Sequence, residues 1–174
     1  MKKFFALPLL CCLLALGSCS DSDTPTPDDG LPAGYVAASG NDALQAGEIT
    51  GEMLFFGRST VRTIGSDETF TDSKALFELT PEGPGTARLL MHETRFAATM
   101  PALEMEVPAI ACTGSEQTLA LAAAAAIPEI KGTPYERYAI TDLSGQVEKT
   151  ALRVTFTCAG RFEVTYEGVL IVRK

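Results

Sequence analysis

The chain has 174 residues, and its 14 basic and 22 acidic side chains give a net charge of −8 at pH 7. Lys and Arg that neutralise phosphates supply most of the affinity for nucleic acid, so this composition, which lacks any basic cluster, argues against a nucleic-acid partner. There is no tryptophan and only one histidine, which leaves few ligands for a transition metal. We therefore expect neither a metal nor a cofactor.

Residues 1–18 have the features of a secretory signal peptide. Lys2 and Lys3 precede an apolar run over residues 4–16, which is shorter than the about 20 residues needed to span a bilayer. The run ends in Leu16-Gly17-Ser18-Cys19. This sequence resembles the lipobox of bacterial lipoproteins, in which small residues fit the peptidase and the thiol receives the diacylglycerol. The resemblance implies cleavage before Cys19, lipidation of Cys19 and anchoring of the mature chain in a membrane.

Residues 19–48 are expected to form a lipidated, disordered tether. The stretch 20–30 contains four Asp residues together with Pro and Gly, and no large apolar side chain, so it cannot form a core. Ser20 follows Cys19 where Asp would favour retention in the inner membrane. The acids that come next resemble the surface-export signal of lipoproteins in gut-type Gram-negative anaerobes. We expect a lipid-anchored outer-membrane protein on the cell surface, with the periplasmic face as the alternative.

The expected globular domain covers residues 49–174, and most of its apolar pattern has the two-residue period of β-strands. Strands are predicted over 49–56, 60–64, 74–80, 86–92, 96–111, 135–140 and 146–147, with a loop at 65–73 and a turn at 81–85. Pro101 and Pro108 interrupt one of these segments. The alanine-rich stretch 116–129 suits both a helix and a strand, and we favour a strand.

The clearest pattern is a hairpin near the carboxyl terminus. Its turn is Ala159-Gly160, and its apolar residues alternate with charged residues or threonines. The apolar set is Leu152, Val154, Phe156 and Cys158 on the first strand and Phe162, Val164 and Tyr166 on the second. The following run, 169–172, is apolar on both faces, as in a strand that closes a barrel or is covered on its outer side.

About eight to ten short strands without a strong helix indicate a single antiparallel β-barrel or sandwich. Three stretches are typical of one group of barrels: the opening strand 49–54, the segment 96–110 with its Val107-Pro108-Ala109-Ile110, and 143–157 with Leu143-Ser144-Gly145-Gln146-Val147. On these stretches the domain resembles the calycin-like family, lipocalin-related β-barrels common as lipoproteins of gut-type Gram-negative bacteria. The resemblance implies a calycin/lipocalin-like all-β barrel and no catalytic residue.

Besides Cys19, the mature chain contains Cys112 and Cys158. Export places them in an oxidising compartment, where an even pair most simply forms a disulfide. We therefore predict a Cys112–Cys158 bridge, and two buried free thiols are the alternative.

Catalytic chemistry has little support in the sequence. His92 is the only histidine, and its place opposite Leu89 and Met91 at a strand end predicts a surface residue rather than a base. The carboxylate pairs Glu104 with Glu106 and Glu163 with Glu167 are common on outward sheet faces. We expect no catalytic residue and no enzyme activity.

The absence of tryptophan and the presence of only four tyrosines argue against a carbohydrate site built on exposed aromatic rings. Two functions remain for a barrel of this size. Eight-stranded barrels either fill with side chains or hold one small ligand. The first hypothesis is a binding module for a small apolar ligand in or at the mouth of the barrel. The alternative is a structural or protein-interaction lipoprotein with a filled barrel, an accessory subunit of an envelope complex. An open apolar cavity favours the first, and a filled barrel with an outer patch favours the second.

Overall fold

The computed structural model describes residues 30–115 and 117–174. The expected signal peptide and the lipidation residue Cys19 lie outside the described residues.

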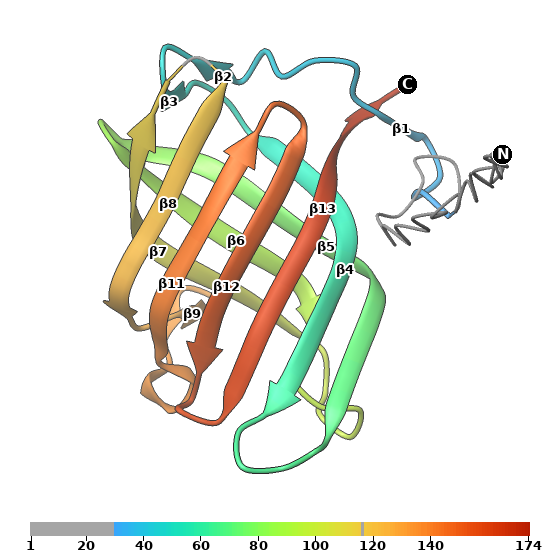
Figure 1. Cartoon of the computed structure of the whole chain (residues 1–174), viewed down its shortest axis with the longest axis vertical. Helices are drawn as coiled ribbons and strands as arrows, with labels where there is room; N and C mark the ends of the chain where they lie inside the picture. Colours follow the sequence, from blue (N-terminus) through green and yellow to red (C-terminus); the bar gives the residue numbers. More distant parts are fainter. Residues whose placement is uncertain (1–29, 116) are drawn as a thin grey trace, which may run out of the picture.

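Eight antiparallel strands close into a barrel (Figure 1). They are β4 (Met53–Thr63), β5 (Thr69–Gly83), β6 (Thr86–Thr94), β7 (Leu103–Gly114), β8 (Thr118–Ala126), β11 (Ile140–Glu148), β12 (Ala151–Cys158) and β13 (Phe162–Arg173). Each of these strands pairs with the next one along the chain, and β13 pairs with β4 to complete the circle. The predicted all-β antiparallel barrel is confirmed.

The predicted carboxyl-terminal hairpin is confirmed in its turn and in its two faces. Leu152, Val154, Phe156 and Cys158 are buried, whereas Arg153 and Thr155 are exposed. Ala159 and Gly160 have φ values of 56° and 59°, and Arg161 N donates to Cys158 O at 3.1 Å. Positive φ at both central residues matches the right-handed twist of the two strands. The apolar run 169–172 is part of β13, the strand that closes the barrel.

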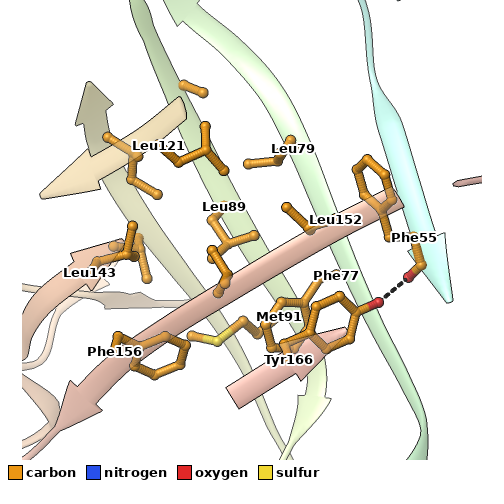
Figure 2. Close-up of a cluster of buried hydrophobic side chains, with 14 of the residues drawn as sticks. Phe55, Phe77, Leu79, Leu89, Met91, Leu121, Leu143, Leu152, Phe156 and Tyr166 are labelled. Atoms are coloured by element: carbon orange, nitrogen blue, oxygen red, sulfur yellow. Dashed lines mark hydrogen bonds between the residues drawn. The ribbon is translucent and has the colours of Figure 1, made fainter. Parts of the chain in front are cut away.

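Apolar side chains meet inside the barrel around Tyr166. Its ring stacks on Phe77 with centroids 3.8 Å apart, and its hydroxyl donates to Phe55 O at 2.9 Å (Figure 2). Tyr166 also lies over Gly168, whose missing side chain leaves room for the ring. Burial raises the pKa of the Tyr166 phenol, and this effect outweighs the lowering by a backbone hydrogen bond at Phe77. Tyr166 therefore joins β13 to β4 and β5.

The amino-terminal part of the described chain crosses one end of the barrel (Figure 1). Strand β1 (Tyr35–Ala37) pairs with the carboxyl-terminal end of β13, which extends beyond the part of β13 that pairs with β12. The short hairpin β2 (Leu44–Gln45) and β3 (Glu48–Ile49) follows, and Leu44 is buried in the core. The predicted domain boundary at residue 49 is therefore wrong. The acidic composition that predicted a tether belongs to residues 20–30, not to the segment that follows.

Three local predictions also need correction. Residues 135–140 hold a 3-10 helix, Glu136–Tyr138, instead of a strand. It follows the small strands β9 (Glu129–Ile130) and β10 (Thr133–Pro134), which pair with each other beside β7. The expected loop at 65–73 is shorter, because Thr69 already pairs with Arg62. Segments 49–56 and 60–64 belong to one strand, β4, with an irregularity between Gly57 and Ser59.

The alanine-rich segment forms strand β8, as predicted. Among residues 30–115 and 117–174, no helix is long and apolar enough to cross a membrane.

Candidate functional site

The barrel interior, where a small-ligand pocket was one expectation, is occupied by large side chains. Those with less than 2% of their surface exposed include Phe55, Phe77, Leu79, Leu89, Met91, Met105, Ile110, Leu119, Leu121 and Tyr166. Phe96 packs at the end opposite β2 and β3, with centroids 5.9 Å from Phe162 and 6.4 Å from Phe156. Because both the middle of the barrel and this end are filled by packed rings, the outer surface is the better place to look for a site.

A shallow cavity of about 620 Å³ opens on the outer face of β11 and β12. Seven of its ten lining residues have polar side chains; the lining comprises Ser144, Gly145, Gln146, Glu148, Lys149, Thr150, Ala151, Arg153, Val154 and Thr155. The pairing of β11 with β12 is irregular between Thr141 and Ser144, next to Asp142 with φ 56°. A Cβ atom on Gly145 would lie 2.7 Å from Arg153 O, so glycine permits the close approach of the two strands here.

A lateral row of hydroxyl side chains runs from this cavity across four strands. Ser144 of β11 pairs with Thr155 of β12, Thr155 with Thr165 of β13, and Thr165 with Thr60 of β4. We call Ser144, Thr155, Thr165 and Thr60 the hydroxyl row, and the exposed Thr71 of β5, which pairs with Thr60, continues it by one strand. Ser144, Thr155 and Thr165 are exposed and Thr60 is partly exposed. The four strands lie side by side on one face of the barrel (Figure 1), so at about 4.8 Å per strand the row spans about 14 Å.

The charges on either side of the hydroxyl row are paired across strands. Arg153 Nε lies 3.4 Å from Glu167 Oε1 on one side, and Arg62 pairs with Glu163 on the other. All four side chains are at least 44% exposed, so these pairs add little stability. They do affect the electrostatic potential of this face. Because each positive charge lies beside a negative one, the surface next to the row has no excess of either sign.

The single histidine lies on the outer face, as predicted, with its ring between two carboxylates. His92 Nε2 is 3.1 Å from Glu78 Oε2, and His92 Nδ1 is 3.1 Å from Glu104 Oε2. The contacts join β5, β6 and β7, and neither hydrogen-bonding partner is a nucleophilic hydroxyl or thiol. This arrangement links three neighbouring strands through one side chain.

The other carboxylates singled out in the sequence are also committed to ion pairs. Glu106 and Glu82 both form ion pairs with Arg88. The hydrogen bonds that Glu82 accepts from Arg88 and from the Ala109 N–H hold the pKa of Glu82 below its usual range. Glu163 and Glu167 pair with different arginines. Within the described parts of the chain, no three His, Cys, Asp or Glu residues come together to hold a metal ion.

The predicted disulfide is not present, because Cys112 and Cys158 are separate free thiols. Cys112 pairs with Leu121 of β8, and the ladder continues from Leu121 through Gly145 to Val154. Cys158 therefore lies three strands away and four residues further along, about 13 Å of strand. A disulfide needs Cα atoms within about 7 Å. Burial raises the pKa of Cys112 to about 11 and that of Cys158 to about 12.

We predict that neither thiol reacts with a thiol reagent at pH 8 while the protein is folded, because the thiolate is the reactive form. When acylated protein purified from membranes is denatured without a reductant, we expect two cysteine thiols per chain to react. A colorimetric thiol titration measures both states. If the denatured protein reacts only after a reductant is added, the bridge exists and the present assignment is wrong.

The hydroxyl row was missed by the sequence reading. Each of its members is one more outward threonine or serine on a strand, a common residue choice for a half-buried sheet. Only the register between strands aligns the four side chains. The available signal was the outward alternation of Thr155 and Thr165 in the predicted hairpin.

Comparison with known proteins adds no further guide to this surface. No protein-family model, curated protein or solved structure matches the chain.

Proposed function

We propose that this protein is a lipid-anchored outer-membrane lipoprotein that binds its partner on the outer face of a filled barrel. The anchor is Cys19, and the site is the outer cavity of β11 and β12 with the hydroxyl row beside it. Of the two barrel interiors expected from the sequence, this proposal takes the filled one. The protein acts by binding, and its display on the cell surface presents the outer face to partners.

One observation carries the choice between the two functions. Phe77 and Tyr166 stack through the middle of the interior, and Tyr166 is held by a hydrogen bond to Phe55 O. A small apolar ligand inside the barrel would have to displace these rings from a packed core, at a cost of several kcal/mol. Binding on the outer face requires no such rearrangement.

Native mass spectrometry of acylated protein, extracted from membranes of its own host in mild detergent, tests the filled interior. We expect the mass of the triacylated mature chain without a bound small molecule. An apolar compound that stays bound after transfer to the gas phase would contradict the proposal and favour the pocket.

The anchor is tested by fractionation of the full-length chain. Cys19→Ser should move the protein out of the detergent phase, because the acyl chains supply the membrane affinity. Cys12→Ser is the matched control, since this cysteine belongs to the expected signal peptide and its loss should leave partitioning unchanged. Equal partitioning of Cys19→Ser and the unaltered protein would remove the basis for the lipoprotein assignment.

A further inference from the structure

We propose that the hydroxyl row and the adjoining cavity bind an uncharged linear glycan. This inference rests on the proposed function, because it requires the outer face to be the binding surface. It adds the chemical class of the ligand, which follows from the hydrogen-bonding groups, the charges and the shape of the surface.

The hydrogen-bonding groups of the row match those of a sugar. A hydroxyl group donates one hydrogen bond and accepts up to two, and sugar hydroxyls have the same dual character. Thr155 Oγ1 donates to Ser144 O at 3.3 Å, and its acceptor sites remain available. The strand spacing repeats these groups about every 4.8 Å along the row, close to the length of one sugar unit in an extended chain. About three sugar units would lie over the four side chains.

The charges beside the row favour a neutral ligand. Arg153 with Glu167 and Arg62 with Glu163 form pairs on the two sides, and the cavity contains Glu148 together with Lys149. An anionic or cationic polymer would gain from one member of each pair and be repelled by the other. An uncharged polar chain meets no such opposition.

The cavity at one end of the hydroxyl row can accommodate the terminal sugar of the glycan. Ser144 and Thr155 belong both to the row and to the lining of the 620 Å³ cavity, where the exposed amide of Gln146 also lies. Beyond them, the outward positions of β8 are the exposed Ala120 and Ala122, which pair with Gln146 and Ser144. These methyl groups are small enough to leave the hollow open and can contact the apolar face of a sugar ring. A terminal sugar unit can therefore occupy the cavity while the rest of the chain follows the row.

Affinity electrophoresis tests this assignment with the full-length protein in mild detergent. Native gels contain a neutral linear polysaccharide (mixed-linkage β-glucan, glucomannan, linear arabinan or amylose) or the anionic polygalacturonate. We expect at least one neutral polysaccharide to retard the protein more strongly than polygalacturonate does. Thr155→Val and Thr165→Val keep the shape and strand preference of the residue but remove the hydroxyl, and each should weaken this binding at least tenfold.

Thr157→Val is the matched control, because Thr157 lies on the outer side of β12 but outside the row, opposite Glu163. Its affinity should stay within twofold of the unaltered protein, and thermal melts should confirm that all three variants fold. The inference is overturned if no neutral polysaccharide retards the protein, if polygalacturonate binds best, or if the row variants bind as well as the control. If no glycan binds and no small molecule is retained in the barrel, only this inference is defeated. A small molecule retained in the barrel would instead defeat the proposed function.

Discussion

Replacing Phe156 by Ala should lower the free energy of unfolding by about 3–5 kcal/mol, the usual cost of removing a large aromatic side chain from a core. The Phe156 ring is buried among the inward side chains of the barrel (Figure 2). It also packs edge-on against Phe96 at one end of the barrel. Alanine would leave a cavity that the strands, fixed by pairing on both edges, cannot close. Denaturant unfolding followed by circular dichroism measures the loss.

The neighbours of Phe156 supply the control for this prediction. Thr155→Ala and Thr157→Ala change the outward positions on either side and should each cost less than about 1 kcal/mol. Because successive side chains of a strand point to opposite faces, a shift of one residue would exchange the two outcomes. Should the threonine variants prove the more damaging, the inner and outer faces of β12 are assigned the wrong way round.

Gly168→Ala should cost about 3 kcal/mol, because adding a methyl group to a tightly packed core forces its neighbours to move. A Cβ atom there would lie 2.3 Å from Tyr166 Oη and 2.7 Å from Tyr166 Cζ. The ring cannot easily move aside, since it is stacked on Phe77 and hydrogen-bonded to Phe55 O. The same unfolding measurement applies, and Gly40→Ala is a control at a site where a Cβ meets no atom within 4 Å.

A double mutant isolates the cause of the Gly168 effect. Tyr166→Phe alone removes the donor to a buried carbonyl and should cost about 1–3 kcal/mol. It also removes the atom nearest to the new methyl group, so the double mutant Tyr166→Phe/Gly168→Ala should lose less than the sum of the two single changes. Strict additivity would show that the ring and the glycine do not constrain each other.

The sequence predicted the structure best where the conformation depends on residues that are close together in the chain. The strands from Leu152 to Tyr166 were predictable because a two-residue period separates their faces and Ala159-Gly160 supplies the turn. The alanine-rich β8 was harder, since alanine favours helix in isolation. Its strand conformation depends on pairing with β11 along its whole length. Local pattern therefore predicted the barrel and the two faces of its clearest hairpin.

The features that were missed depend on how distant segments meet. Strand β1 forms because β13 extends past the end of β12, which local composition cannot reveal. The two cysteines suggested a bridge by their number, but the distance between them depends on their positions around the barrel. The hydroxyl row likewise requires the register of four strands. Each of these three features could be identified only once the positions of the strands around the barrel were known.

The pairing of β13 with β4 determines when the barrel can form. Phe162 pairs with Thr63 and Ile171 with Leu54, so the partners lie roughly 100 residues apart in the chain. Contacts of such long sequence separation form slowly, because a large loop must be ordered before they stabilise the fold. The last strand must therefore leave the ribosome, or emerge from a translocation channel, before the circle can close. Until β13 is present, the facing edges of β4 and β12 have no partner strand, so the barrel stays open along that side.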